Sequence, residues 1–181
     1  MDKSRKEVLK WQILSVIWVI VISSLLHFVF EWSGNSPIVG AFSPVNESVW
    51  EHLKLGFWSM ILFCFIEYPI IRKYTNDYFY AKAIGIFAMS LFIVLFFYSY
   101  TVIIGRTILF IDIGSYIVGA IIYGIINYKI MMRSFERNVN MIGLVLLIIF
   151  GVLFVLFTFY PPHLPIFKDS QTGTYGITRE H

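Results

Sequence analysis

The chain has 181 residues, of which 58% are apolar and only 14% charged, and its mean hydropathy is +0.75. Water-soluble domains carry about 25% charged residues, so this composition excludes a soluble globular protein and predicts an integral membrane protein. The formal net charge of +3 is too small to indicate a nucleic-acid partner. The lipid bilayer is the first partner that we expect.

Five apolar segments are long enough to cross a bilayer. Backbone groups in lipid must be satisfied internally, so unbroken apolar runs without alternation predict helices of about 20 residues. One run, Tyr80–Tyr128, is too long for a single span and is interrupted at Gly105–Thr107. The predicted fold class is all-α: a polytopic membrane protein with one domain over residues 1–181. Its helices cover about residues 11–32, 46–71, 80–104, 107–128 and 141–160, with a tail at 161–181.

The positive charges predict an orientation. Lysine and arginine concentrate in cytoplasmic loops, and ten of the 14 would lie on the side of the N-terminus. These are Lys3, Arg5, Lys6, Lys10, Arg72, Lys73, Lys82, Lys129, Arg133 and Arg137. The opposite side would hold Lys54, Arg106, Lys168 and Arg179. We therefore expect the N-terminus inside and the C-terminal tail outside.

Small residues recur at helical spacing in the last two spans. Ser115 with Gly119 and Ala120 with Gly124 are four apart, and Gly143 is followed by Gly151 on the same stripe. Such positions let helix backbones approach closely in membranes. The pattern predicts tight helix packing and offers faces for a homo-oligomer.

Ionisable residues gather at the predicted outer ends of the helices. His27 and Glu31 share one helix face, as do Glu47 and Glu51, with His52 beside them. His163 follows the last span, and Glu67, expected to extend toward the cytoplasmic interface, is the exception. Charged residues within membrane spans are energetically costly and indicate a functional site.

These residue types are suited to a transition metal. Imidazole and carboxylate are standard zinc ligands, and a catalytic zinc keeps three protein ligands and one open position. We expect His27, His52, His163 and Glu31 as metal ligands, and Glu51 or Glu47 as general base or further ligand. The chain has no H-E-x-x-H motif, so the site would be assembled from separate segments.

Three functions fit this pattern. The first is a zinc-dependent hydrolase that acts on lipid or peptide groups at the outer leaflet. The second is a non-enzymatic transporter or receptor that binds a cation or protons, although few polar groups are evident toward the inner side. The third is a structural accessory subunit whose polar cluster locks the helix ends. The sequence names no substrate.

Two motifs carry a resemblance. The segments "SPVNESVWEHLK" (43–54) and "PPHLPIFKD" (161–169) resemble those of a family of small uncharacterised bacterial integral membrane proteins. The motif positions are Ser43, Pro44, Asn46, Glu47, Trp50, Glu51, His52, Lys54, Pro161, Pro162, His163 and Asp169. The resemblance implies a multi-pass protein of the bacterial inner membrane, and it implies no substrate or reaction.

Overall fold

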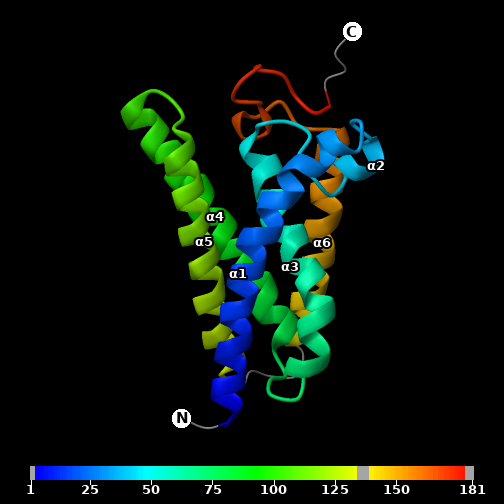
Figure 1. Ribbon diagram of the computed structural model, residues 1–181, viewed down its shortest axis with the longest axis vertical. Coiled ribbons are helices and arrows are strands. Elements are labelled where there is room, and N and C mark those ends of the chain that lie inside the picture. Colours follow the sequence, from blue (N-terminus) through cyan, green and yellow to red (C-terminus); the bar gives the residue numbers. More distant parts are fainter. Residues whose placement is uncertain (1–2, 134–138, 178–181) are drawn as a thin grey trace.

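The computed structural model describes residues 3–133 and 139–177, and this part of the chain is helical without a strand (Figure 1). Five helices are long and apolar enough to cross a membrane, which confirms the predicted fold class. They are α1 (Lys3–Trp32), α3 (Val49–Ile71), α4 (Tyr78–Ile104), α5 (Leu109–Met131) and α6 (Val139–Phe159). A short helix α2 (Pro37–Gly40) and a 3-10 turn η1 (Pro165–Phe167) complete the elements.

The helix limits differ from the predicted ones most clearly at the starts of α1 and α3. Helix α1 already begins at Lys3, because the basic segment before the apolar run continues the helix. Helix α3 begins at Val49 rather than near residue 46. Ser48 provides the N-cap, since its hydroxyl accepts the amide of Glu51 at 3.3 Å. The apolar run therefore predicts the span, while the polar cap fixes its first residue.

The small residues pack helices of the same chain together. A side chain at Gly124 would collide with Val16 of α1, and one at Gly143 would collide with the backbone of Tyr80 in α4. Gly119 faces α4, where a side chain would come within 3.2 Å of Met89 and Ile93. These close approaches explain the stripe of small residues as internal packing positions.

A buried ion pair joins α3 to α4 in the half of the bundle nearer the N-terminus. Lys82 Nζ lies 2.6 Å from a Glu67 carboxylate oxygen, and both side chains are 0% exposed. Gln12 donates to Glu67 at 2.7 Å, and Lys82 donates to the Tyr123 hydroxyl at 2.9 Å. The expectation that Glu67 reaches the interface was wrong, and Lys82 is not a loop residue. Glu67 of α3 and Lys82 of α4 pair with each other inside the bundle instead.

A second buried ion pair lies near the other end of the bundle. Lys54 Nζ lies 2.5 Å from a Glu51 oxygen and donates to the Gly40 carbonyl at 2.7 Å. The Thr158 hydroxyl of α6 accepts from Lys54 at 2.8 Å and lies 3.0 Å from the other Glu51 oxygen. This network ties α2, α3 and α6 together.

The two ends of the bundle differ in structure. One end carries α2 and the tail at 160–177, and we call it the site end. The opposite end carries the start of α1 and the loop at 72–77. At the site end the tip of the α4–α5 hairpin diverges from the other helices (Figure 1). Helix α2 and the tail thus lie at the same end of the bundle as the diverging tip of the α4–α5 hairpin.

Candidate metal site

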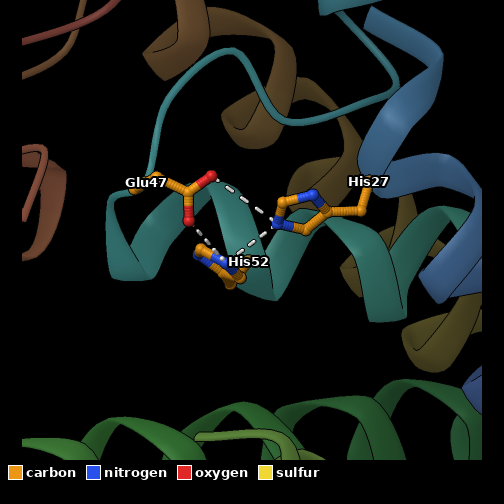
Figure 2. Close-up of side chains that lie close together, drawn as sticks. All are labelled: His27, Glu47 and His52. Carbon is orange, nitrogen blue, oxygen red and sulfur yellow. Dashed lines mark hydrogen bonds and ion pairs between the residues drawn. The ribbon is translucent and has the colours of Figure 1, made fainter. Parts of the chain in front are cut away.

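Three side chains converge at the site end (Figure 2). The Nε2 atoms of His27 and His52 are 3.4 Å apart. One Glu47 carboxylate oxygen lies 3.4 Å from His52 Nε2, and the other lies 3.7 Å from His27 Nε2. Within the described residues, these three form the group of potential ligands that could hold a metal ion.

Each side chain comes from a different local context. His27 lies in the last turns of α1, and Glu47 lies just before the Ser48 cap of α3. His52 lies in the first turn and a half of α3, where its Nδ1 is 2.9 Å from the Ser48 carbonyl oxygen. A carbonyl oxygen can only accept, so Nδ1 carries the hydrogen. In the neutral ring the lone pair is then on Nε2, which faces the other two side chains.

The C-terminal tail holds Glu47 in place. Ser170 donates its hydroxyl to the Glu47 carbonyl at 3.0 Å, and the Glu47 amide donates to Asp169 at 3.4 Å. Asp169 also accepts the amides of Gln171 and Thr172, at 2.7 and 3.0 Å. Burial alone would raise the pKa of Asp169, but these amide hydrogen bonds lower it. The turn is therefore built around a charged carboxylate.

The site is partly open to its surroundings. The His27, Glu47 and His52 side chains are 31%, 34% and 34% exposed. When His52 is protonated, its Nε2 donates to the Glu47 carboxylate, and this hydrogen bond lowers the pKa of Glu47, although burial opposes the shift. Glu47 therefore stays ionised well into the acidic range, and it presents a negative charge to both imidazoles.

The spacing of the two imidazole nitrogens matches that of neighbouring ligands around a tetrahedral ion. Zinc bonds to nitrogen and oxygen of about 2.0–2.1 Å separate neighbouring tetrahedral ligands by about 3.3–3.4 Å. The two Nε2 atoms are 3.4 Å apart, and one ligand atom from each of the three residues lies within 4.8 Å of the others. Two imidazole lone pairs and a carboxylate at these distances repel one another unless a cation or a proton lies between them.

The other predicted site residues lie outside this group. Glu51 is buried in its ion pair with Lys54 and also accepts the Val45 amide at 3.1 Å. Glu31 is exposed one turn beyond His27. His163 is exposed in the tail, where its ring packs edge-on against Tyr175 at 4.7 Å. The structure thus brings together two of the predicted histidines and one of the two predicted base candidates.

A line of buried polar groups was missed in the sequence. The Tyr116 hydroxyl of α5 donates to Ser23 at 2.5 Å, and Ser23 lies 2.8 Å from the Ser59 hydroxyl of α3. Nearer the opposite end, Ser15 lies 3.0 Å from the Tyr123 hydroxyl. Gln12, Ser15, Ser23 and His27 recur at intervals of three, eight and four residues on α1. This spacing keeps the four residues on one helix face, and it is the sequence signal from which the line of polar groups could have been predicted.

Comparison with known proteins identifies the family. The family of unknown function DUF6512 matches residues 1–177. The chain belongs to this family. The match covers both motifs and all five long helices. The candidate site therefore lies within the part of the chain that the family model matches. No curated protein matches the chain, and no solved structure does so.

Proposed function

We propose that His27, Glu47 and His52 bind a zinc ion and that the protein is a zinc-dependent membrane hydrolase. The observation that carries this proposal is the convergence of the two Nε2 atoms, 3.4 Å apart, with Glu47, which has one oxygen 3.4 Å from His52 and the other 3.7 Å from His27. Imidazole with carboxylate favours zinc over calcium and magnesium, which prefer oxygen shells. His52 is already oriented for this role by the Ser48 carbonyl, as ligating histidines usually are.

The reaction class follows from the number of ligands. A zinc ion with three protein ligands retains a position for water or substrate and makes bound water acidic enough to react near neutral pH. We assign Glu47 to ligation and assign no base role to Glu51, because Lys54 and Thr158 occupy its oxygens.

Transport is the second candidate function. The polar line from Ser23 and Tyr116 toward Lys82 and Glu67 favours it, because transporters continue polar groups across the membrane. A buried apolar layer that includes Val19 separates the two parts of this line. Zinc uptake by proteoliposomes would support transport, whereas zinc binding without flux supports the hydrolase.

Metal analysis of untagged protein, purified without chelator, tests the proposal. We expect zinc at near one ion per chain. The lowered pKa of Glu47 keeps this ligand ionised, so the histidines control the pH dependence. Their protonation competes with the metal, and occupancy should fall as the pH is lowered through the range in which imidazole becomes protonated. Isothermal titration with zinc between pH 5 and 8 measures this profile.

The same measurement can contradict the proposal. Folded protein that binds no zinc at pH 7.5 would mean that a proton, shared by His52 and its neighbours, relieves the repulsion in the site. Occupancy that does not change between pH 8 and pH 5 would show that the metal is bound elsewhere. Calcium serves as the control ion, because the same ligand set should bind it far more weakly.

We further propose that the site end faces the outside of the cell. The predicted charge asymmetry remains after Lys82 and Lys54, which the structure buries, are left out. Arg137 and Arg179, which contribute to it, lie outside the described residues. Alkaline phosphatase fused after residue 181 should be active, and a fusion in the loop at 72–77 should be inactive. The reverse pattern would place the site in the cytoplasm.

A further inference from the structure

The candidate metal site opens toward the α4–α5 hairpin. Glu47 and the two histidines keep about a third of their side-chain surface exposed. Asp112 lies in the first turn of α5. Tyr100 of α4 donates to this Asp112 carboxylate at 2.5 Å and so fixes its position. Phe97 and Tyr98 of this hairpin line a cleft together with Val49, which lies between Glu47 and His52 in the sequence, so the hairpin stands beside the metal ligands.

The tip of this hairpin stands away from the other helices (Figure 1). Val102 and Ile103 at the end of α4 are 81% and 84% exposed, and Phe110 at the start of α5 is 85% exposed. Lower in the bundle, the Tyr116–Ser23 hydrogen bond joins α5 to α1 one turn below His27. The separation of hairpin and bundle thus ends just beneath the metal ligands.

A cleft of about 470 Å³ occupies part of this separation. Phe97 and Tyr98 of α4 line it on one side, and Val49 of α3 lines it on another. The tail supplies its polar wall, with residues 168–173. Asp169 and Ser170 of this wall bond to the Glu47 backbone, so the cleft adjoins the metal ligand.

The lining and the surroundings of the cleft indicate an amphiphile. Exposed apolar side chains of a membrane protein lie in lipid, so the diverging hairpin gives bilayer lipids access to the cleft from the side. Aromatic residues of α4 suit acyl chains, while Lys168 and the serine and threonine side chains of the tail suit a phosphorylated headgroup. A water-soluble substrate would not require an apolar hairpin on one wall.

We propose that the ligand of this site is a membrane phospholipid that enters laterally between the α4–α5 hairpin and the rest of the bundle. Its headgroup reaches the metal ligands, and its acyl chains remain in the bilayer beside Phe97. This assignment rests on the proposed metal site and specifies its substrate class. Lateral entry of lipid also explains why α1, α3 and the tail form the site while the tip of the α4–α5 hairpin stands away from them.

Photolabelling tests the proposal with the full chain in nanodiscs. The probe is a phosphatidylglycerol with a diazirine in one acyl chain, added in metal-free and in zinc-loaded samples. We expect labels on Phe97, Tyr98 and Val49, mapped by mass spectrometry. Val49 is only 8% exposed, so lipids around the outside of the bundle do not reach it. Bilayer-facing residues such as Val118 should be labelled as a reference.

Two variants distinguish the cleft from the outer surface. Gln171→Trp fills the cleft from the tail and should lower labelling of Tyr98 and Val49 several-fold, with zinc content unchanged. Val118→Trp, on an exposed face of α5, should leave cleft labelling unchanged. The side chain of Gln171 carries no contact needed by the Asp169 turn, which uses its backbone amide.

The outcomes separate the lipid assignment from the metal assignment. Zinc binding without labels in the cleft, or labels that Gln171→Trp does not reduce, would overturn the lipid assignment alone. Competition by water-soluble glycerophosphoglycerol as strong as by intact lipid would also overturn it, because acyl chains would then contribute nothing. Cleft labelling in a chain that binds no zinc would support lipid entry and remove the proposed hydrolase.

Discussion

Replacement of His52 by alanine should reduce bound zinc from near one ion per chain to a background level. Removal of one of three protein ligands leaves a shell that cannot hold the ion at micromolar concentrations. It also removes the ring whose Nδ1 is fixed by the Ser48 carbonyl. The measurement is elemental analysis after dialysis, together with the absorption spectrum of cobalt-substituted protein, which reports tetrahedral coordination.

Graded and matched variants make this result specific. Asp169→Asn weakens the turn that positions Glu47, so zinc should still bind, with affinity lower by about 10–100-fold. His163→Ala should leave zinc content unchanged, because that ring lies against Tyr175 outside the group. Full zinc content in the His52→Ala protein would contradict the proposed ligand set. Loss of zinc in the His163→Ala protein would show that His163 belongs to the ligand set.

Replacement of Lys82 by methionine should destabilise the protein by about 3–5 kcal/mol, because it leaves the Glu67 carboxylate buried without its cation. The effect is expected to be large since neither side chain has any exposed surface. The free energy of unfolding can be measured by denaturant titration in mixed micelles, followed by tryptophan fluorescence. Lys10→Met, at an exposed position of α1, is the control and should change little.

A double variant shows whether the pair itself is needed. Glu67→Gln combined with Lys82→Met removes both charges and retains a polar partner for Gln12 and Tyr78. It should recover most of the stability lost in Lys82→Met, because no unpaired charge remains. If the double variant is as unstable as the single one, the pair contributes specific hydrogen-bond geometry rather than charge balance.

The spans could be predicted because a bilayer permits few backbone solutions. Long apolar runs such as Trp11–Trp32 and Met141–Tyr160 leave only helices, so α1 and α6 were found without any knowledge of their packing. Short polar elements obey weaker rules. Helix α2 and the cap at Ser48 depend on local hydrogen bonds that several nearby residues could have formed.

The candidate site could be predicted only in part. Topology brought His27, Glu47 and His52 to one end, because each lies at a recognisable distance from the end of a span. It could not separate Glu47 from Glu51, since this choice depends on side-chain direction at the start of α3. Glu51 turns inward to Lys54, three residues on, while Glu47 precedes the helix and is held by the tail. The local sequence also does not reveal which residue of another helix a side chain will contact, as the pairing of Glu67 with Lys82 shows.

The two histidines lie 25 residues apart in the chain, and the Glu47 backbone is bonded to a turn 122 residues further on. An ion shared by these side chains would cross-link the first span to the start of α3, where the Glu47 backbone is bonded to the tail. Ligands that bind only the folded state add stability with their concentration, by about 4 kcal/mol at a thousandfold excess over Kd. Zinc should therefore slow proteolysis of residues 160–177, a segment that would otherwise be held mainly by hydrogen bonds and packing at the end of the bundle.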